Sequence, residues 1–119
     1  MKIASIEEFL LSLPATTRSV QWGHDHVFKV GGKMFAIMGF VDKETFHGLS
    51  FKTADDSYRI LTELPGFIPA PYLARAHWVR MDRPSRLQAA ELKAYLKRAH
   101  AIVSSGLPKK TQRELGLIP

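Results

Sequence analysis

The chain has 119 residues, which is enough for one domain over residues 1–119 that buries roughly two thirds of its unfolded surface, and too few for two domains. Hydrophobic residues make up 45% and charged residues 24%, which argues against a disordered chain and against a membrane protein. The sequence contains no cysteine, which excludes disulfides, thiolate zinc sites and thiol chemistry and suits a reducing compartment.

Positive charge is concentrated in the second half of the sequence. Seven basic side chains balance seven acidic ones in residues 1–59, whereas ten basic side chains stand against four acidic ones in residues 60–119, which gives the net charge of +6. Such a surplus favours an anionic partner. It is equally typical of a protein that is simply soluble and basic, so the charge leaves both interpretations open.

The first predicted element is a helix that ends at Pro14. Ser5 as N-cap with Glu8 three residues later forms a capping box, and apolar residues follow at helical spacing up to Leu13. Glu7 and Glu8 interrupt the apolar run that a secretory signal needs. No apolar run approaches the ~20 residues that cross a bilayer. We therefore expect a cytoplasmic protein that does not enter membranes.

A β-hairpin is predicted over residues 27–38. The pair Gly31-Gly32 lies between two apolar strands and supplies the positive φ that a two-residue type I′ turn needs. In this register Phe28 faces Phe35. The second strand is apolar on both faces up to Val41, which predicts a central strand with a helix on at least one side.

The rest of the chain alternates strands and helices. The predicted elements are a polar loop at residues 42–48, a strand at 49–52, a helix at 54–64, a proline-stiffened stretch at 65–71, a strand at 77–81, a long helix from 85 to 105 and a short basic helix at 108–115. The long helix starts at a second capping box, in which Ser85 is followed by Gln88. This order predicts an α+β fold in which helices pack against one antiparallel sheet.

The long helix carries a row of basic side chains. Their spacing of seven, four and three residues places four of them on one helix face, namely Arg86, Lys93, Lys97 and His100. The fold could bring further basic residues beside this row, namely Arg75, Arg80, Arg83, Lys109, Lys110 and Arg113. A surface of this kind binds a phosphate backbone. The other interpretation is a solvated helix face.

Tryptophan is well suited to stack on a nucleic-acid base, and the chain contains two. Trp78 lies near Arg80 in a predicted strand, and Trp22 precedes the hairpin. Both lie in strongly patterned segments, so we expect both to pack in the core.

No catalytic or metal site is predicted. His24 and His26 flank Asp25 in the tightest cluster, but no third ligand follows at a suitable spacing, so we expect no metal and no cofactor. No nucleophile lies beside a base in a recognisable motif, and the pair Gly31-Gly32 lacks the sequence of a phosphate-binding loop. We therefore expect a protein that is not an enzyme.

Several segments, taken in order, resemble the MmcQ/YjbR family. They are Trp22-Gly23-His24, Val27 to Ala36, Leu49 to Lys52, Pro65 to Ala70, His77-Trp78-Val79 and Leu107-Pro108-Lys109-Lys110. The resemblance implies a frataxin-like α+β sandwich and DNA binding through a double-wing arrangement. Residues 72–76 depart from the family pattern, which is more polar there. Iron handling, which a frataxin-like fold also suggests, would need an acidic ridge on the first helix, and only Glu7 and Glu8 lie there.

We therefore predict a DNA-binding protein of low sequence specificity. The residues assigned to phosphate contacts are Arg75, Arg80, Arg83, Arg86, Lys93, Lys97, Lys109 and Lys110. Specificity is expected to be low because no helix carries the Asn, Gln and Arg set that reads base edges in the major groove. The alternative is a module that binds an acidic protein or a small anionic ligand.

Overall fold

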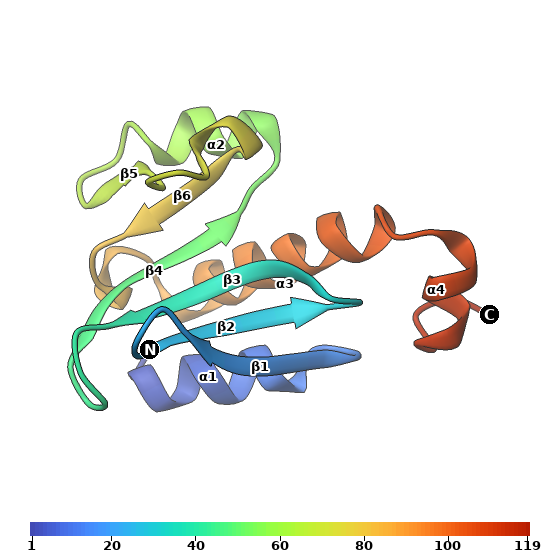
Figure 1. The fold of residues 1–119 in the computed structure, drawn as a ribbon. Helices are drawn as coiled ribbons and strands as arrows, with labels where there is room; N and C mark the ends of the chain where they lie inside the picture. Colours follow the sequence, from blue (N-terminus) through green and yellow to red (C-terminus); the bar gives the residue numbers. More distant parts are fainter.

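A six-stranded antiparallel sheet forms the centre of the molecule, and the computed structural model describes all of residues 1–119. Its strands are β1 (Thr16–Gln21), β2 (Asp25–Val30), β3 (Lys33–Phe40), β4 (Phe46–Lys52), β5 (Phe67–Pro69) and β6 (Trp78–Met81). They lie side by side in the order β1-β2-β3-β4-β6-β5, so β1 and β5 are the two edges (Figure 1). The predicted hairpin and its central second strand are confirmed as β2 and β3.

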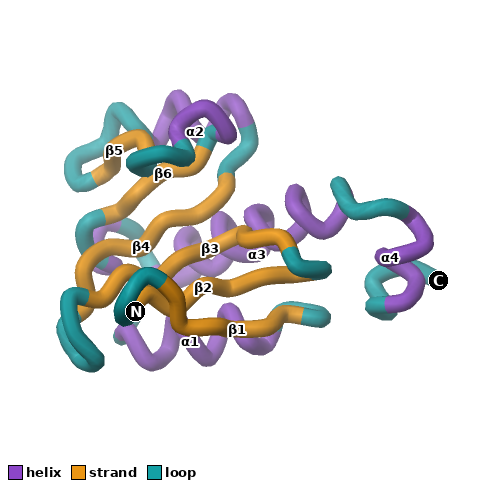
Figure 2. The backbone as a smooth tube through the Cα atoms, viewed as in Figure 1, coloured by secondary structure: helices purple, strands orange, loops and turns teal.

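The two longest helices cover one face of this sheet. The helices are α1 (Ile3–Ser12), α2 (Asp55–Leu61), α3 (Ala89–Ser105) and α4 (Lys109–Glu114), with short 3-10 turns η1 (Ala74–Ala76) and η2 (Pro84–Arg86). Figures 1 and 2 show α1 and α3 behind the sheet, α2 beside β5 and β6, and α4 beyond the end of α3. The predicted α+β architecture is therefore confirmed. No helix combines the length and the apolar character that crossing a membrane requires.

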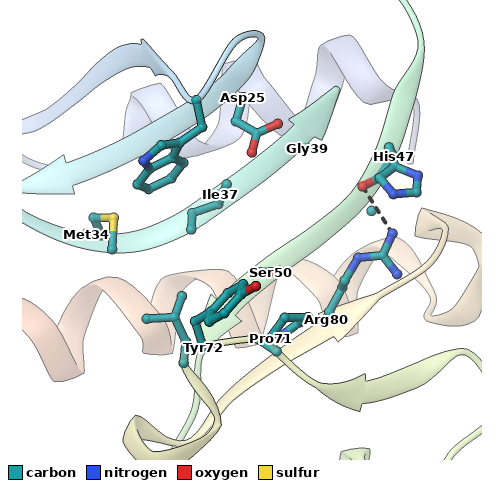
Figure 3. A pocket seen from close by; sticks show the side chains of 13 residues that line it. Asp25, Met34, Ile37, Gly39, His47, Ser50, Pro71, Tyr72 and Arg80 are labelled. Carbon is teal, nitrogen blue, oxygen red and sulfur yellow. Dashed lines mark hydrogen bonds between the residues drawn. The ribbon is translucent and has the colours of Figure 1, made fainter. Parts of the chain in front are cut away.

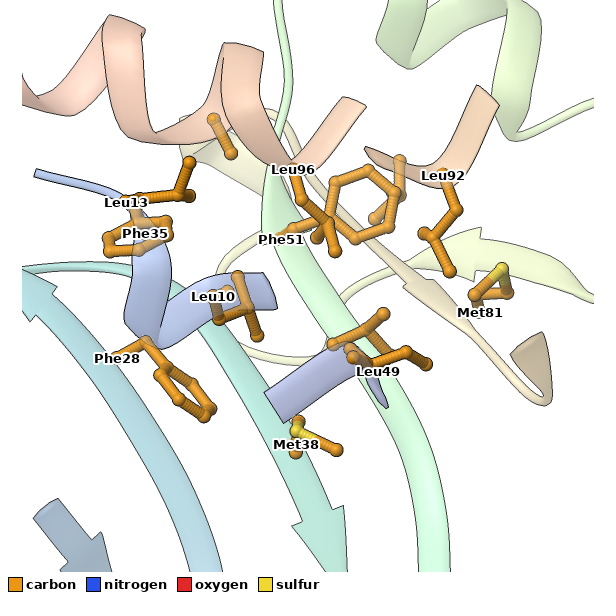
Figure 4. Packing of buried hydrophobic residues seen from close by; sticks show 14 of the residues in the cluster. Leu10, Leu13, Phe28, Phe35, Met38, Leu49, Phe51, Met81, Leu92 and Leu96 are labelled. Carbon is orange, nitrogen blue, oxygen red and sulfur yellow. The ribbon is translucent and has the colours of Figure 1, made fainter. Parts of the chain in front are cut away.

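The core lies between the sheet and the layer formed by α1 and α3 (Figure 4). The buried stripe of α3 runs through Leu92, Leu96 and Ala99, which are four and three residues apart and therefore share one helix face. They meet Phe51 from the sheet, and Leu10 of α1 joins them. All five are fully buried, so each element contributes one apolar face to a single cluster.

The register of the hairpin differs from the prediction by one residue. Gly31 and Gly32 do form the turn, with φ of +59° and +79°. A register shift between Phe28 and Lys29 makes Phe28 pair with Ala36 rather than with Phe35. The extra residue in β3 is a β-bulge, which turns strands locally and is not visible in a simple alternating pattern.

Several boundaries also differ from the prediction. The first helix begins at Ile3, and Ser5 does not cap it; Ile3 packs against the core, which extends the helix toward the N-terminus. The long helix begins at Ala89, with the backbone N–H of Gln88 donating to Glu91 Oε1 at 3.3 Å, because the preceding residues form η2. The predicted polar loop is shorter, because β4 already starts at Phe46.

The two edge strands were not predicted. β1 reads Thr-Thr-Arg-Ser-Val-Gln and has no apolar face, and none of its residues is fully buried. β5 has only three residues and ends in Pro69, which an edge strand tolerates because its N–H need not enter a ladder. Both strands therefore owe their conformation to pairing with a neighbour rather than to their own pattern.

No helix covers the other face of the sheet (Figures 1 and 2). Strand pairing places one continuous row of side chains across it, namely Ser19, Val27, Ile37, Ser50, Arg80 and Ile68. We refer to this side as the uncovered face, and to the side beneath α1 and α3 as the covered face.

Candidate functional site

A hollow of about 560 Å³ opens on the uncovered face (Figure 3). This volume lies in the range of about 300–1,000 Å³ that small-molecule sites occupy. Its floor comes from β3, β4 and β6, and its rim comes from the β1–β2 turn and from the connection between β5 and η1. We call it the sheet hollow, and its lining includes Trp22, Asp25, Met34, Ile37, Gly39, Gly48, Ser50, Pro71, Tyr72, Leu73 and Arg80.

Two glycines keep the floor of the sheet hollow low. A Cβ on Gly39 would lie 2.6 Å from the His47 carbonyl oxygen. A Cβ on Gly48, whose φ is +86°, would lie 2.6 Å from the guanidinium group of Arg80. Gly39 therefore permits the close approach of the β4 backbone, whereas Gly48 leaves room for the Arg80 side chain to lie across β4, where its Nη2 donates to the His47 carbonyl oxygen at 3.2 Å. The result is a cation held in place beside an open floor.

Two aromatic side chains stand on the rim. Trp22 is 63% exposed and Tyr72 is fully exposed. Both have left-handed backbones, with φ of +52° and +66°, a conformation that costs a bulky residue about 1–3 kcal/mol. The expectation that Trp22 packs in the core is therefore wrong, whereas the same expectation for Trp78, which is 4% exposed, is confirmed. Neither burial nor a favourable backbone explains why large aromatic side chains occupy the rim.

The uncovered face carries more positive than negative charge. Lys29, Lys52 and Arg80 project from its strands, as the alternation of side chains along β2, β4 and β6 requires. Lys52 Nζ donates to the Ala76 carbonyl oxygen. Asp25 is the acidic residue of the lining, and its Oδ1 accepts the backbone N–H of Phe40 at 3.0 Å. An anion entering the hollow therefore meets the cation of Arg80 in the lining, with Lys29 and Lys52 further out on the same face.

The predicted phosphate-binding residues do not gather on one surface. Arg80 lies in the sheet hollow, and Arg75 lies next to it in η1, which packs against β6. Arg83 and Arg86 lie at the far end of β6, before α3. Arg86 is in η2 rather than on the helix, so the predicted row of basic residues on α3 does not include it.

Arg86 also has a partner of its own. Its Nε and Nη2 donate to the two carboxylate oxygens of Asp82, each at 2.9 Å. These hydrogen bonds lower the pKa of Asp82 from 3.8 to about 2 and raise the pKa of Arg86. The charge of Arg86 is therefore largely matched within the molecule and is less available to a phosphate than that of Arg80.

The remaining predicted residues lie on the helix layer. Lys93 and Lys97 are exposed on α3, and Lys93 Nζ lies 5.8 Å from the ring centroid of Phe9 on α1. His100, which was expected in the same row, is only 6% exposed, and its Nε2 lies 2.7 Å from the Pro14 carbonyl oxygen. The expected row is therefore reduced to two lysines. Lys109 and Lys110 lie on α4, away from both.

The histidine cluster does not converge on a metal. His26 Nδ1 lies 2.6 Å from Glu7 Oε1, which also accepts a hydrogen bond from Arg18 at 2.9 Å, while Asp25 bonds the backbone. No group of three or more His, Asp or Glu side chains is arranged to hold a metal ion. A second histidine, His77, pairs with Asp55 at 2.6 Å, again outside the sheet hollow.

Sequence reasoning named Arg80 but missed the aromatic residues on the rim of the hollow and two lysines of the uncovered face. Trp22 and Tyr72 each lie in a short turn, beside Gly23 and after Pro71 respectively, and an aromatic residue in a turn has few core neighbours. An aromatic residue within a turn was therefore the feature of the sequence that could have indicated an exposed ring. Lys29 and Lys52 were also missed, because they alternate with core residues along strands and form no cluster in the sequence.

Comparison with known proteins identifies relatives of this chain. A family model described as YjbR matches residues 11–102, which is more than half of the chain. A similar solved structure is the crystal structure of Deinococcus radiodurans protein DR2400, which carries the family-model domain DUF419. It superimposes with a TM-score of 0.83 at 22% identity, covering 99% of this chain and 89% of that one, and at this identity the likeness shows the fold. A search of the curated proteins finds no match.

Proposed function

This chain belongs to the YjbR family, and we propose that it is a non-enzymatic DNA-binding protein of low sequence specificity. The observation that carries the proposal is the uncovered face, where two exposed aromatic side chains and Arg80 line one hollow and Lys29 and Lys52 project from the same face. This combination is typical of proteins that bind nucleic acid through phosphate contacts and base stacking. The cytoplasmic location expected from the sequence is part of the same proposal.

The phosphate contacts are assigned to four cations on or beside the uncovered face, namely Lys29, Lys52, Arg75 and Arg80. Phosphate contacts supply affinity without reading sequence. Stacking is also tolerant of sequence, because every base offers a π face. Both contributions favour binding of low specificity.

The other basic residues act at longer range. Arg83, Lys93, Lys97, Lys109 and Lys110 lie outside the hollow, on the helix layer or at the end of β6, and contribute to the net charge of +6 that attracts a polyanion. Their effect is screened within about 10 Å at 0.1 M salt, so it is weaker than that of a direct contact.

A second candidate function is the binding of a small anionic ligand. The observation that favours it is the hollow of about 560 Å³, which is large enough to take a free molecule. In this case Arg80 would bind the anionic group, and DNA would not compete with the ligand.

The proposal is tested by fluorescence anisotropy of labelled single-stranded and double-stranded DNA, titrated at several salt concentrations. We expect micromolar or tighter binding. If four phosphates are contacted in a single strand, log K should fall against log salt with a slope of about −3. A slope near zero, or no binding at low salt, would contradict the proposal.

A further inference from the structure

We propose that the sheet hollow binds unpaired bases, which stack on Trp22 and Tyr72 while Arg80 contacts the phosphate that joins them. The site would then select single-stranded over double-stranded DNA. This inference rests on the proposed function and names its substrate class. It goes beyond electrostatic attraction, because it assigns a role to two aromatic residues that the predicted basic surface did not include.

The two aromatic residues of the rim come from different parts of the chain. Trp22 belongs to the β1–β2 turn, and Tyr72 belongs to the connection between β5 and η1, so they line the hollow from segments 50 residues apart in the sequence. Strands β3 and β4 contribute the half-buried side chains of Ile37 and Ser50 to the floor of the same hollow (Figure 3). Flat apolar groups that enter here find an aromatic surface at either side and an apolar contact below.

The left-handed backbones of Trp22 and Tyr72 also indicate a binding role. A glycine would adopt φ of +52° or +66° without cost, yet the chain places tryptophan and tyrosine there. Trp22 and Tyr72 gain little from burial in the free protein, since both are largely exposed. A ligand that covers the two rings supplies the missing apolar contact, which gives these residues a physical reason to be on the rim.

Base pairing decides which DNA can use the site. In a duplex, each base face is covered by its neighbours in the stack, so a side chain on the rim of a hollow cannot reach it without extruding the base. Unpaired bases expose their faces and are recognised by stacking on aromatic side chains. The sheet hollow, with a volume of about 560 Å³, gives such a base room to enter.

The charges of the lining place the backbone of the bound strand. The Arg80 guanidinium is held by the His47 carbonyl oxygen and lies within the hollow, so it is positioned for one phosphate. Asp25 is the acidic residue of the lining, and its carboxylate repels a phosphate from the part of the hollow near β2. The strand should therefore run with its phosphates toward Arg80 and with its bases toward the aromatic rim.

The chain offers a built-in reporter for this binding. Of its two tryptophans, Trp78 is 4% exposed and Trp22 is 63% exposed, so quenching of the intrinsic fluorescence by a base reports mainly on Trp22. The probe is an unlabelled 12-nucleotide single strand of mixed sequence. It is compared with the same length of abasic strand, which keeps the phosphates and lacks the bases, with the duplex, and with a free deoxynucleoside monophosphate.

We expect the single strand to quench the fluorescence and to bind at least about tenfold tighter than the abasic strand and the duplex. Trp22→Ala and Tyr72→Ala should each weaken binding of the single strand by about 5- to 150-fold, measured by anisotropy of the same strands carrying a fluorescent label, and leave binding of the abasic strand unchanged. Trp22→Phe should retain most of the affinity. Ile60→Ala, which removes a similarly exposed apolar side chain from α2, is the matched control and should change nothing.

The remaining outcomes separate the inference from the proposed function. Equal affinity for the normal and the abasic strand, or for strand and duplex, would overturn base binding in the hollow while leaving DNA binding through phosphates intact. Quenching by the mononucleotide with no binding of any strand would overturn both and would assign the hollow to a free nucleotide. Unchanged affinity in folded Trp22→Ala and Tyr72→Ala variants would also overturn the inference.

Discussion

Neighbouring residues of the same strand have different roles on the two faces of the sheet. On the covered face, Phe51 is fully buried against Leu96 of α3 and the rest of the core cluster. On the uncovered face, Ser50, the residue next to Phe51, lines an open hollow together with Ile37 and Arg80. Alternation along a strand therefore separates the residues that stabilise the fold from those available to a ligand.

Several features of the uncovered face are not explained by the stability of the fold. Burial accounts for the large side chains of the covered face. It does not account for Trp22 and Tyr72, which are exposed and hold left-handed backbones, nor for Gly48, which gives up a side chain so that Arg80 can lie across β4. These are the features that a binding site explains.

Truncation of a core side chain on the covered face should destabilise the protein most. Phe51→Ala should lower the free energy of unfolding by about 3–5 kcal/mol, because the cavity it leaves is enclosed by the core. Ile37→Ala, one strand away on the uncovered face, should lower it by about 1 kcal/mol, since this side chain is only half-buried. Urea unfolding followed by circular dichroism measures both, and equal losses would contradict the distinction between the two faces.

A glycine on the uncovered face provides the next effect. Gly48→Ala should cost about 1–3 kcal/mol, because the new methyl group meets a left-handed backbone and displaces Arg80. Gly32→Ala is the matched control, with φ of +79° and no atom within 4 Å of the new Cβ. Thermal unfolding should show the larger loss for Gly48→Ala, and the excess measures the clash with Arg80. A larger loss for Gly32→Ala would refute this assignment.

Substitution of Trp22 on the rim should not destabilise the protein, in contrast to the substitutions above. Trp22→Gly removes a bulky residue from φ of +52°, so stability should stay the same or rise by up to about 1 kcal/mol, with part of the gain offset by the greater freedom of glycine in the unfolded chain. Binding of single-stranded DNA should weaken in the same variant. A stability loss above about 1 kcal/mol would instead assign Trp22 a structural role.

Loss of the pair Asp82 and Arg86, which lies outside both faces, should change stability least. The pKa of Asp82 is lowered to about 2 by the hydrogen bonds from Arg86, so the pair stabilises the folded state above pH 3.8 and this contribution is lost as the pH falls toward 2. Asp82→Asn should flatten the pH dependence of the melting temperature in this window. Parallel curves for the two proteins would show that the pair contributes nothing to acid stability.

The sequence predicted most of the covered face and little of the uncovered one. The hairpin turn at Gly31-Gly32, the apolar stripe of α3 and the α+β class follow from local spacing, and all are present. The bulge that pairs Phe28 with Ala36 was not predictable, because it depends on how the third strand meets the second.

The candidate site was predictable only in part. Arg80 was named for its charge, but its place in the hollow depends on Gly48, which is 32 residues away in the sequence. The row on α3 was wrong at His100 because a histidine at helical spacing with lysines can still turn inward, here to the Pro14 carbonyl oxygen. Residues brought together from different strands and turns carry no spacing that a single sequence displays.

Two double charge reversals determine which side of the molecule meets the nucleic acid. They are Lys29→Glu with Arg75→Glu on and beside the uncovered face, and Lys93→Glu with Lys97→Glu on the helix layer. Both change the net charge by the same amount. In anisotropy titrations of a single-stranded oligonucleotide at 0.1 M salt, the first double variant should weaken binding by about tenfold or more, and the second by less than about threefold. Equal losses, or a larger loss for the helix-layer variant, would contradict the assignment of the uncovered face as the binding surface.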